Sequence, residues 1–446
     1  MKARGAASPG RELFRKAPAH LHLVGCGGAG MAGLAGILLD RGFRLSGCDL
    51  HDHDRVRRLA ERGMAFMASH DPGHIRDLNP DAVVRSAAVS ASEPEIRAAM
   101  ERGIPVLRRG EALPGAFESR TGVAVAGSHG KTTTTALLVR VMETAGIGCG
   151  YAVGGDLPDR ADAGRDGDPV VLEADESDGT VALYEPDVAI VTSIEPDHME
   201  HHADEDAFVE CFRRLIDQTS GPVFYYGDDP GARGLCAGIA CAKPYHERDL
   251  AAWPLARLPG RHNRRNAAAA ALAARYLGVP EAAIRRGLES ASLPKRRYER
   301  ISESGGVRVV ADYAHHPTEI RALIELAREE GRGRILAAFQ PHRYTRTRNL
   351  REAFPPALAG VDRLWLLPVY PAFESPLPGG RSRDLAASFP ADFAAKRLRE
   401  ADDPETAARE IDAEAQPGDT VLIIGAGDIE RMADYWRAPR GRGEIV

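Results

Sequence analysis

The segment VAVAGSHGKTTTTALL (123–138) contains residues that could bind the phosphates of a nucleotide. The common phosphate-binding loop has the pattern G-x-x-x-x-G-K-[ST]. Gly130, Lys131 and Thr132 provide the end of this pattern, but a valine stands where its first glycine is expected. The nearest preceding glycine is Gly127, which gives G-x-x-G-K-T. The spacing indicates either a shortened phosphate loop or a chance glycine–lysine pair at a helix start.

The residue types favour the phosphate loop. A glycine-rich turn between a strand and a helix presents backbone N–H groups to phosphate oxygens. Lys131 can reach a terminal phosphate, and the hydroxyl of Thr132 can ligate Mg²⁺. The alternative is a simple helix cap made by Ser128 or Thr132. Four consecutive threonines are poor helix formers, so their presence here favours a polar role.

A run of carboxylates, EADESD (173–178), ends the predicted strand PVVLEADESD. Oxygen ligands suit Mg²⁺, and an acidic strand end beside a phosphate loop is typical of nucleotide-hydrolysing sites. The alternative is a solvated acidic loop. The nearby phosphate loop favours a metal-binding role for at least one of these side chains.

Three histidines lie in SIEPDHMEHH (193–202). The cysteine and histidine spacing of structural zinc sites is absent. His198 ends a predicted apolar strand and is therefore the candidate for a functional role, although a single histidine is more often structural. We expect His201 and His202 to face solvent.

A glycine-rich turn near the N-terminus, GCGGAG, places Gly25, Gly27 and Gly30 in the pattern G-x-G-x-x-G between a predicted strand and helix. Glycines let the backbone approach a pyrophosphate, and the helix N-terminus favours its negative charge. Asp49 ends the next predicted strand, where an acidic residue would meet a ribose hydroxyl. The alternative is a tight turn without a ligand, and the pattern alone does not identify the nucleotide.

Basic and histidine side chains follow two strands near the C-terminus. FQPHRYTRTR (339–348) contains Arg343, Arg346 and Arg348, and DYAHHPTE (312–319) follows the strand before it. Arginine binds carboxylates and phosphates through two parallel hydrogen bonds. A surface basic patch is the alternative, but two polar strand ends side by side favour a site.

These segments must be positioned by α/β units, because short apolar strands alternate with helical stretches along the chain. In open parallel sheets, ligands bind beyond the carboxyl ends of the strands. The pattern predicts an α/β protein with mainly parallel sheets. The predicted divisions are a flexible tail (1–18) and three blocks: 19–110, 111–294 and 295–446.

The composition restricts the class of protein. The net charge of −6 argues against a general nucleic-acid binder. Six scattered cysteines without a C-x-x-C pair suit a reducing compartment. The basic N-terminus lacks the apolar region of a secretory signal, and no apolar run has the length of a membrane span. We therefore expect a cytoplasmic protein without membrane insertion, acting as a monomer or homodimer.

Taken together, these motifs resemble those of the Mur ligases of bacterial cell-wall synthesis, whose own phosphate loop has the G-x-x-G-K-T form. The resemblance spans roughly residues 20–430. Within the family, the resemblance is strongest to the branch that joins L-alanine to UDP-N-acetylmuramate. The pair of segments DYAHHPTE and FQPHRYTRTR favours this branch over its siblings. The matching runs, in family order, are GCGGAGMAGLA, GSHGKTTTT, EADESD, IEPDHME, PGRHNRRNAAAA, DYAHHPTE, FQPHRYTRTR, VYPAFESPLPG and GAGDI.

The resemblance implies an N-terminal Rossmann-like domain for the UDP substrate, a central P-loop ATPase-like domain for MgATP and a C-terminal Rossmann-like domain for the amino acid. The implied contacts to the UDP substrate are Gly27, Gly28, Ala29, Gly30 and Met31 at the pyrophosphate, with Asp49, His70 and Ser86 near the uridine.

For ATP the resemblance implies a loop, an adenine contact and a ribose contact. These residues are Gly127, Ser128, His129, Gly130, Lys131, Thr132 and Thr133, then His262 and Asn266 at adenine, and Asp312 at the ribose. The implied Mg²⁺ ligands are Thr132, Glu173 and His198. The implied catalytic residues are Lys131, His198 and His315, with either histidine as a possible base, and Arg343 and Arg346 clamp the L-alanine carboxylate.

The chain departs from the family pattern at Ala311, Ser193 and Lys295, which affects nucleotide contacts and substrate detail. Three other functions are considered. A sibling ligase would attach a whole peptide to UDP-N-acetylmuramate during wall recycling. A dinucleotide-binding oxidoreductase would explain the first glycine pattern but not the phosphate loop. A non-catalytic regulatory binder would explain the departures but not the intact Lys131, Glu173 and His198.

Overall fold

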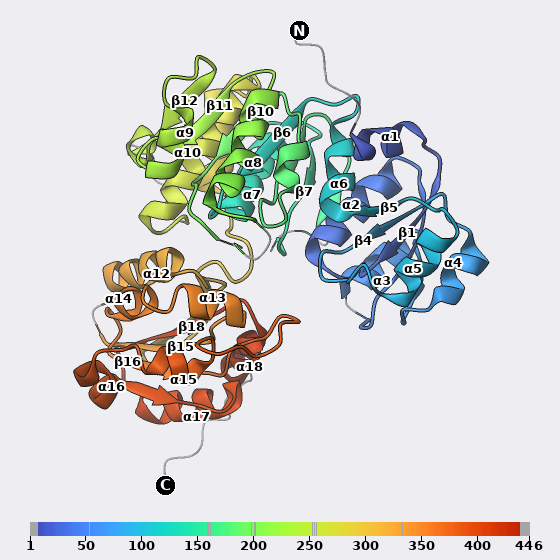
Figure 1. Cartoon of the computed structure of the whole chain (residues 1–446). Coiled ribbons are helices and arrows are strands. Elements are labelled where there is room, and N and C mark those ends of the chain that lie inside the picture. Colours follow the sequence, from blue (N-terminus) through green and yellow to red (C-terminus); the bar gives the residue numbers. More distant parts are fainter. Residues whose placement is uncertain are drawn as a thin grey trace. The chain divides into compact units, whose positions relative to one another are not determined.

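The computed structural model describes residues 8–52, 54–157, 160, 162–197, 199, 202–251, 253, 255, 257–331 and 333–437. The chain forms two compact units (Figure 1). Unit 1 comprises residues 1–258 and 262–294, and unit 2 comprises residues 259–261 and 295–446.

The first sheet of unit 1 has five parallel strands in the order β3-β2-β1-β4-β5. This order reverses direction between β1 and β4, which is where ligands bind in Rossmann-like sheets. The strands are β1 (His20–Val24), β2 (Arg44–Cys48), β3 (Ala65–Met67), β4 (Ala82–Arg85) and β5 (Val106–Arg108). The helices are α1 (Pro9–Arg15), α2 (Ala29–Asp40), α3 (Asp54–Glu61), α4 (Pro72–Leu78), α5 (Pro94–Glu101), α6 (Arg109–Ala112) and η1 (Leu113–Phe117).

The second sheet of unit 1 has the order β12-β11-β10-β6-β9-β7-β8, and only the edge pair β7 and β8 is antiparallel among its described strands. The strands are β6 (Gly122–Ala126), β7 (Gly150–Ala152), β8 (Gly164–Arg165), β9 (Val170–Glu173), β10 (Val188–Val191), β11 (Val223–Tyr226) and β12 (Ala242–Tyr245). The helices are α7 (Lys131–Thr144), η2 (Thr180–Leu183), α8 (Glu205–Gln218), α9 (Pro230–Cys236), η4 (Glu247–Leu250), α10 (Arg261–Tyr276) and α11 (Glu281–Glu289).

The two sheets of unit 1 share one continuous apolar core. Helix α2 crosses to the second sheet, and it approaches β8 backbone to backbone. A Cβ on Gly36 would lie 2.0 Å from the carbonyl oxygen of Gly164, so no larger residue fits there. The glycines within MAGLAG therefore set the packing of the first domain on the second.

Unit 2 contains a six-stranded sheet in the order β13-β14-β18-β15-β16-β17, in which β13 pairs antiparallel and the other strands are parallel. The strands are β13 (Glu299–Ser304), β14 (Val307–Asp312), β15 (Ile335–Phe339), β16 (Arg363–Leu366), β17 (Leu398–Glu400) and β18 (Thr420–Ile424). The helices are α12 (Pro317–Glu330), α13 (Tyr344–Asn349), α14 (Phe354–Leu358), α15 (Ser382–Ala386), α16 (Ala391–Arg397), α17 (Pro404–Glu414), η5 (Asp428–Arg431) and α18 (Met432–Arg437).

The prediction of a flexible tail over residues 1–18 is wrong for its described part. Pro9–Arg15 forms helix α1, capped by the side chain of Ser8. Leu13 and Phe14 are buried, and the Phe14 ring packs edge-on against Phe43 at 5.7 Å between centroids. Two apolar side chains in so short a helix produce no visible periodicity, so the sequence did not reveal that they complete the core.

Replacing Phe14 with alanine should lower the free energy of unfolding of unit 1 by about 3 kcal/mol, because it removes a buried ring and leaves a cavity. Lys16→Ala, at the exposed end of the same helix, should change it by less than about 0.5 kcal/mol. Chemical denaturation measures both. Equal effects of the two substitutions would contradict a structural role for α1.

Candidate functional site

The phosphate loop joins β6 to α7 and requires glycine at two positions. Gly127 has φ +132°, and a Cβ there would lie 2.1 Å from Thr192 Oγ1. Gly130 has φ +83°, and a Cβ there would lie 2.5 Å from Asn266 Oδ1. The left-handed backbone and the close neighbours together exclude other residues. The shorter loop is therefore a tightly packed turn, and it brings Asn266 of α10 next to Gly130.

The segment after β10 supports this loop from the other side. The carbonyl oxygen of Ser193 accepts a hydrogen bond from Ser128 N at 3.1 Å, and Ser193 Oγ accepts one from His129 N at 3.0 Å. The hydroxyl of Ser128 donates to the carbonyl oxygen of Glu195 at 2.7 Å. Ser193, one of the departures from the family pattern, thus orders the loop through its hydroxyl.

Lys131 lies among carboxylates at the start of α7. Its Nζ donates to Glu176 Oε2 at 2.7 Å and to the carbonyl oxygen of Gly127 at 2.7 Å. Glu176 is fully buried. Burial alone would lower the pKa of Lys131, but Glu176, Asp175 and Glu173 outweigh it and raise the pKa above its ordinary value. Lys131 therefore carries a positive charge beside the loop at neutral pH.

Thr132 and Glu173 form a pair of oxygen donors next to Lys131. Thr132 Oγ1 donates to Glu173 Oε1 at 3.0 Å, and Gly154 N donates to Glu173 Oε2 at 2.8 Å. Neighbouring ligands of an octahedral Mg²⁺ ion with bonds of about 2.1 Å lie about 3 Å apart. The two oxygens therefore fit a shared magnesium ion.

Arg109 connects this acidic strand end to the N-terminal glycine turn. Its guanidinium donates to Asp175 Oδ2 at 3.1 Å, and a Cβ on Gly30 would lie 3.1 Å from Arg109 Cδ. The sequence prediction did not include Arg109, and it included Glu176 only as part of the acidic run EADESD. Arg109 directly follows β5, so the rule that strand ends carry the site could have identified it.

The glycine turn after β1 is fixed by Asp49, which follows β2. Gly27 N donates to Asp49 Oδ2 at 2.8 Å, and Gly28 is the N-cap of α2. Ser86 lies against the same turn, because a Cβ on Gly25 would lie 2.9 Å from Ser86 Cβ. The side chain of Met31 is buried in the core, so it offers a ligand its backbone alone.

In unit 2, Asp312 ends β14 and accepts hydrogen bonds from Tyr298 N at 2.7 Å and Ala314 N at 2.8 Å. Burial raises the pKa of Asp312 to about 6, although Arg297 and these two hydrogen bonds lower it. These two backbone donors fix the position of the Asp312 carboxylate, so that it can accept a hydrogen bond from a hydroxyl group. Ala311, the preceding departure from the family pattern, is buried and supplies no charge.

The segments that follow β14 and β15 contain the predicted histidine and arginine residues, and they contact each other through a row of aromatic rings. The sequence prediction missed this row. His315 packs against His342 at 5.9 Å between ring centroids, and His342 stacks on Tyr370 at 5.5 Å. Arg346 is buried and donates to His342 Nδ1 at 3.2 Å. Arg343 precedes α13 with φ +69°. His342 belongs to the segment FQPHRYTRTR, but the sequence does not show that its ring packs against both His315 and Tyr370.

Other predicted residues lie elsewhere or outside the described part. His262 lies in the first turn of α10, and Thr133 is buried one residue after Thr132. His198 and His201 lie outside the described residues. His202 Nε2 donates to the carbonyl oxygen of Glu176 at 3.0 Å, so this side chain does not simply face solvent.

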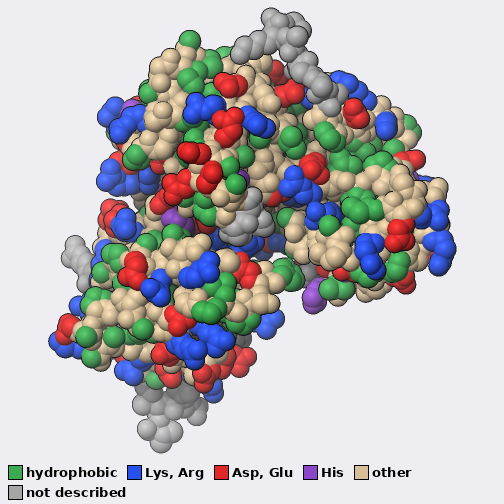
Figure 2. All heavy atoms as spheres, in the orientation of Figure 1, with side chains coloured by type: hydrophobic (Ala, Val, Ile, Leu, Met, Phe, Trp, Pro, Cys, Tyr) green, Lys and Arg blue, Asp and Glu red, His purple; other side chains and the backbone are tan. Residues whose placement is uncertain are grey.

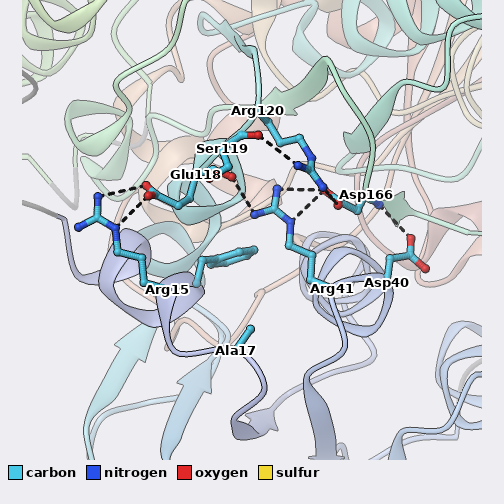
Figure 3. A pocket seen from close by; sticks show the side chains of 9 residues that line it. Arg15, Ala17, Asp40, Arg41, Glu118, Ser119, Arg120 and Asp166 are labelled. Carbon is cyan, nitrogen blue, oxygen red and sulfur yellow. Dashed lines mark hydrogen bonds and ion pairs between the residues drawn. The ribbon is translucent and has the colours of Figure 1, made fainter.

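A hollow of about 400 Å³ in unit 1 contains none of the predicted site residues (Figure 3). Its charges are paired: Arg15 with Glu118 at 2.9 Å, and Arg41 and Arg120 with Asp166 at 2.9 and 2.7 Å. The pair of Arg41 with Asp166 connects the end of α2 to the second sheet, just after β8, and the pair of Arg15 with Glu118 connects α1 to the end of η1. Elsewhere on the visible surface of each unit, acidic and basic side chains are interspersed (Figure 2).

Three models of one family match the chain in order: the Mur ligase family catalytic domain over residues 20–121, the Mur ligase middle domain over 125–244 and the Mur ligase glutamate ligase domain over 296–427. The chain belongs to the Mur ligase family. This confirms the resemblance and the predicted three-domain α/β fold.

Named relatives show which member of the family this chain is similar to. A protein of Kineococcus radiotolerans named UDP-N-acetylmuramate–L-alanine ligase is 41% identical over 92% of this chain and 93% of its own length. One of the same name from Saccharopolyspora erythraea is 38% identical over 92% and 91%. The solved UDP-N-acetylmuramate–alanine ligase of Thermotoga maritima shares the fold with a TM-score of 0.76 at 24% identity, covering 94% of this chain and 98% of its own. Within the described residues, no helix is long and apolar enough to span a bilayer.

Asp312 gives unit 2 a defined pH dependence. Its folded-state pKa lies above its ordinary value of 3.8, so the neutral form stabilises the fold below about pH 4 and this stabilisation is lost as the pH rises through about 6. Relative to Asp312→Asn, the unsubstituted chain should lose up to about 3 kcal/mol of unfolding free energy between pH 4 and 7.

Denaturation of both chains in a Trp253→Phe background measures this loss, because the remaining tryptophans, Trp365 and Trp436, both lie in unit 2. A stability difference that does not change with pH would contradict the environment described for Asp312.

Proposed function

We propose that this chain joins L-alanine to the carboxylate of UDP-N-acetylmuramate at the expense of ATP, in the cytoplasm. The observation that carries the proposal is the packed phosphate loop, with the Lys131 cation and the Thr132 and Glu173 oxygen pair on one side of it. A family relationship with named alanine ligases over more than nine-tenths of the chain supports it.

ATP binds at the phosphate loop in this proposal. The backbone N–H groups after Gly127 and the Lys131 ammonium receive the phosphates, and Asn266, close to Gly130, contacts the adenine together with His262. Thr132 and Glu173 hold Mg²⁺, with His198 as a further ligand. When bound, this ion supplies positive charge that offsets the phosphate charge. Asp312 of unit 2 accepts a hydrogen bond from the ribose.

The UDP substrate binds at the glycine turn of the first sheet. The backbone N–H groups at the start of α2, from Gly28 to Met31, receive its pyrophosphate, as helix N-termini commonly do. Asp49, His70 and Ser86 are the proposed contacts near the uridine. Arg109 is added to the proposed site, because its guanidinium lies over Gly30 and is paired with Asp175, at the boundary between the turn and the acidic strand end.

The amino acid binds in unit 2. Arg343 and Arg346 clamp its carboxylate, since guanidinium groups bind carboxylates in a fixed geometry. His315 is the proposed base. Its Nδ1 lies 3.0 Å from the carbonyl oxygen of Tyr313, which can only accept, so Nδ1 carries the proton and Nε2 has the lone pair that can take a proton from the amine.

The reaction has two balanced steps. A carboxylate oxygen of UDP-N-acetylmuramate attacks the terminal phosphorus of ATP, which breaks the bond to ADP and gives an acyl phosphate. The unprotonated amine of L-alanine then attacks the acyl carbon, and phosphate leaves. Lys131 stabilises the negative charge on the transferred phosphoryl group, which is the main contribution that a protein makes to such transfers.

The direct test is release of ADP by the purified chain. UDP-N-acetylmuramate, ATP, Mg²⁺ and L-alanine together should release ADP. Omission of either UDP-N-acetylmuramate or L-alanine should abolish steady turnover. Lys131→Ala should reduce turnover by at least about a thousandfold without changing the fold. No ADP with L-alanine, glycine or L-serine would refute the proposal.

The same assay separates the other functions. Faster turnover with a tripeptide than with L-alanine would identify a peptide-recycling ligase, and binding of NAD without ADP formation would identify an oxidoreductase. Ligand binding without any turnover would identify a regulatory binder.

Two glycines at opposite ends of α7 form a matched pair of substitutions. Gly130 and Gly146 have φ of +83° and +76°, so alanine causes similar backbone strain at both, but only at Gly130 does the new Cβ meet an atom, Asn266 Oδ1. Gly130→Ala should lower kcat/KM for ATP by about a hundredfold or more, because displacing the loop misplaces the phosphates. Gly146→Ala should leave it unchanged. Equal kcat/KM values for the two variants would exclude this loop as the ATP site.

A further inference from the structure

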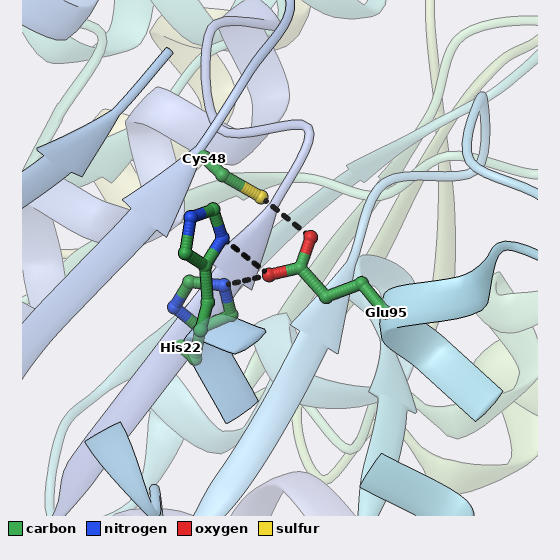
Figure 4. Close-up of side chains that lie close together, drawn as sticks. His22, Cys48 and Glu95 are labelled. Carbon is green, nitrogen blue, oxygen red and sulfur yellow. Dashed lines mark hydrogen bonds and ion pairs between the residues drawn. The ribbon is translucent and has the colours of Figure 1, made fainter. Parts of the chain in front are cut away.

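A second group of side chains in unit 1 has no part in the proposed reaction. His22 of β1, Cys48 at the end of β2, His74 of α4 and Glu95 of α5 place one ligand atom each within 4.8 Å of one another. Figure 4 shows Cys48, His22 and Glu95 pointing toward a common centre. Four separate elements of the first domain thus bring sulfur, nitrogen and oxygen donors together.

The group is almost closed to solvent. The side chains of His22 and Glu95 are 0% exposed, Cys48 is fully buried, and His74 is 17% exposed. A buried carboxylate requires a compensating partner, because desolvation of an isolated charge is costly. His74 is the one member through which a small ion could reach the centre from solvent.

The contacts within the group all converge on Glu95. Its Oε1 lies 2.9 Å from His22 Nε2 and 3.0 Å from His74 Nδ1, and its Oε2 lies 3.1 Å from Cys48 Sγ. Burial alone raises the pKa of Glu95, but the hydrogen bonds from His22, Cys48 and His74 outweigh it and lower the pKa. Burial and the nearby Glu95 carboxylate both raise the pKa of the Cys48 thiol.

We propose that His22 Nε2, Cys48 Sγ, His74 Nδ1 and the Glu95 carboxylate bind one Zn²⁺ ion, which holds the first sheet to helices α4 and α5. The site is additional to the magnesium site and adjoins the proposed uridine contact His70, whose Nδ1 lies 3.2 Å from Cys48 Sγ and 3.5 Å from Glu95 Oε2. Sulfur and imidazole donors select zinc over Mg²⁺, and four such ligands complete its tetrahedral coordination. Because protein ligands fill all four coordination positions and leave none open to water or substrate, the site is structural.

The charges and distances suit this ion. A thiolate and a carboxylate together neutralise Zn²⁺, so no net charge is left in the interior. Ligand atoms of tetrahedral zinc lie about 3.3–3.7 Å apart, given bonds of about 2.0–2.3 Å. The donors now lie 2.9–3.1 Å from the Glu95 oxygens, so they need to separate by only about 0.5 Å.

The protons balance without another reactant. The thiol of Cys48 releases its proton to solvent as the sulfur–zinc bond forms, since a coordinating thiol is deprotonated by the metal. In each imidazole, the proton on the ligating nitrogen is exchanged through solvent for one on the other ring nitrogen. The reaction therefore releases one proton per ion.

Ser46 provides the partner that a zinc-bound histidine requires. Zinc-ligating histidines donate their second N–H to an oxygen, which fixes the ring. His22 Nδ1 lies 2.9 Å from Ser46 Oγ, and the same oxygen lies 2.9 Å from His20 Nε2. Arg44 donates to His20 Nδ1, so His20 donates to Ser46 through Nε2. Ser46 Oγ has two acceptor positions and can receive both imidazoles.

The test uses the full-length chain, stripped of metal and titrated with Zn²⁺ and with Co²⁺. One Zn²⁺ per chain should remain after dialysis, and Co²⁺ should give a thiolate-to-cobalt charge-transfer band with the visible bands of a tetrahedral ion. Absence of both in the unsubstituted chain means that the group is a hydrogen-bonded network only, and overturns the proposal whatever the variants do.

Three substitutions locate the ion. Cys48→Ser should remove the charge-transfer band. Ser46→Ala keeps all four ligands and should weaken Zn²⁺ binding about 10- to 100-fold, as loss of such a supporting hydrogen bond does. Cys236→Ser, at a buried thiol of the central domain, should change neither. Unchanged binding in Cys48→Ser and Ser46→Ala, or loss in Cys236→Ser, would place the ion elsewhere and overturn the proposal. ADP release is not a readout here, so the result is independent of the proposed function.

Discussion

The contact between Lys131 and the carboxylates that follow β9 is the interaction on which the proposed site depends. A lysine at the start of a helix, next to a tight turn, would otherwise be a flexible surface cation. Glu176 holds it at 2.7 Å, and the phosphate loop packs around the same point through Gly127. A polyanionic ligand must compete with Glu176 for this cation, so the site favours ligands that carry several phosphate charges together with a metal ion.

Close backbone packing in unit 1 also holds the proposed site in a fixed geometry. Gly36 and Gly164 allow α2 to touch β8, and Gly127 and Gly130 allow the loop to touch Thr192 and Asn266. Arg109 then connects the first domain's glycine turn to the acidic strand end. The two proposed binding regions, built on separate sheets, therefore share one apolar core, which suits the positioning of two substrates in a bimolecular reaction.

Much of this arrangement could be predicted from the sequence because the chemistry follows strand ends. Lys131, Thr132 and Glu173 lie at such ends, and parallel strands bring their carboxyl ends to one edge of a sheet. Arg109 was missed although it directly follows β5, whereas the particular contacts of Glu176 and His342, which lie inside predicted motifs, depend on side-chain packing that the sequence does not show. Helix α1 was missed because the burial of Leu13 and Phe14 depends on residues distant in the chain, such as Phe43, against which Phe14 packs. The group around Glu95 was hidden for the same reason: its four members are spread over four elements.

Transfer of a carboxylate oxygen is the most direct test of the central claim, that this site activates a carboxylate by phosphorylation. UDP-N-acetylmuramate labelled with ¹⁸O in its carboxylate is turned over with ATP and L-alanine, and the released phosphate is examined by mass spectrometry. The account predicts one ¹⁸O atom in each phosphate, because that oxygen bridges carbon and phosphorus in the acyl phosphate. Unlabelled phosphate would contradict it, since ATP would then have been cleaved without activating the carboxylate.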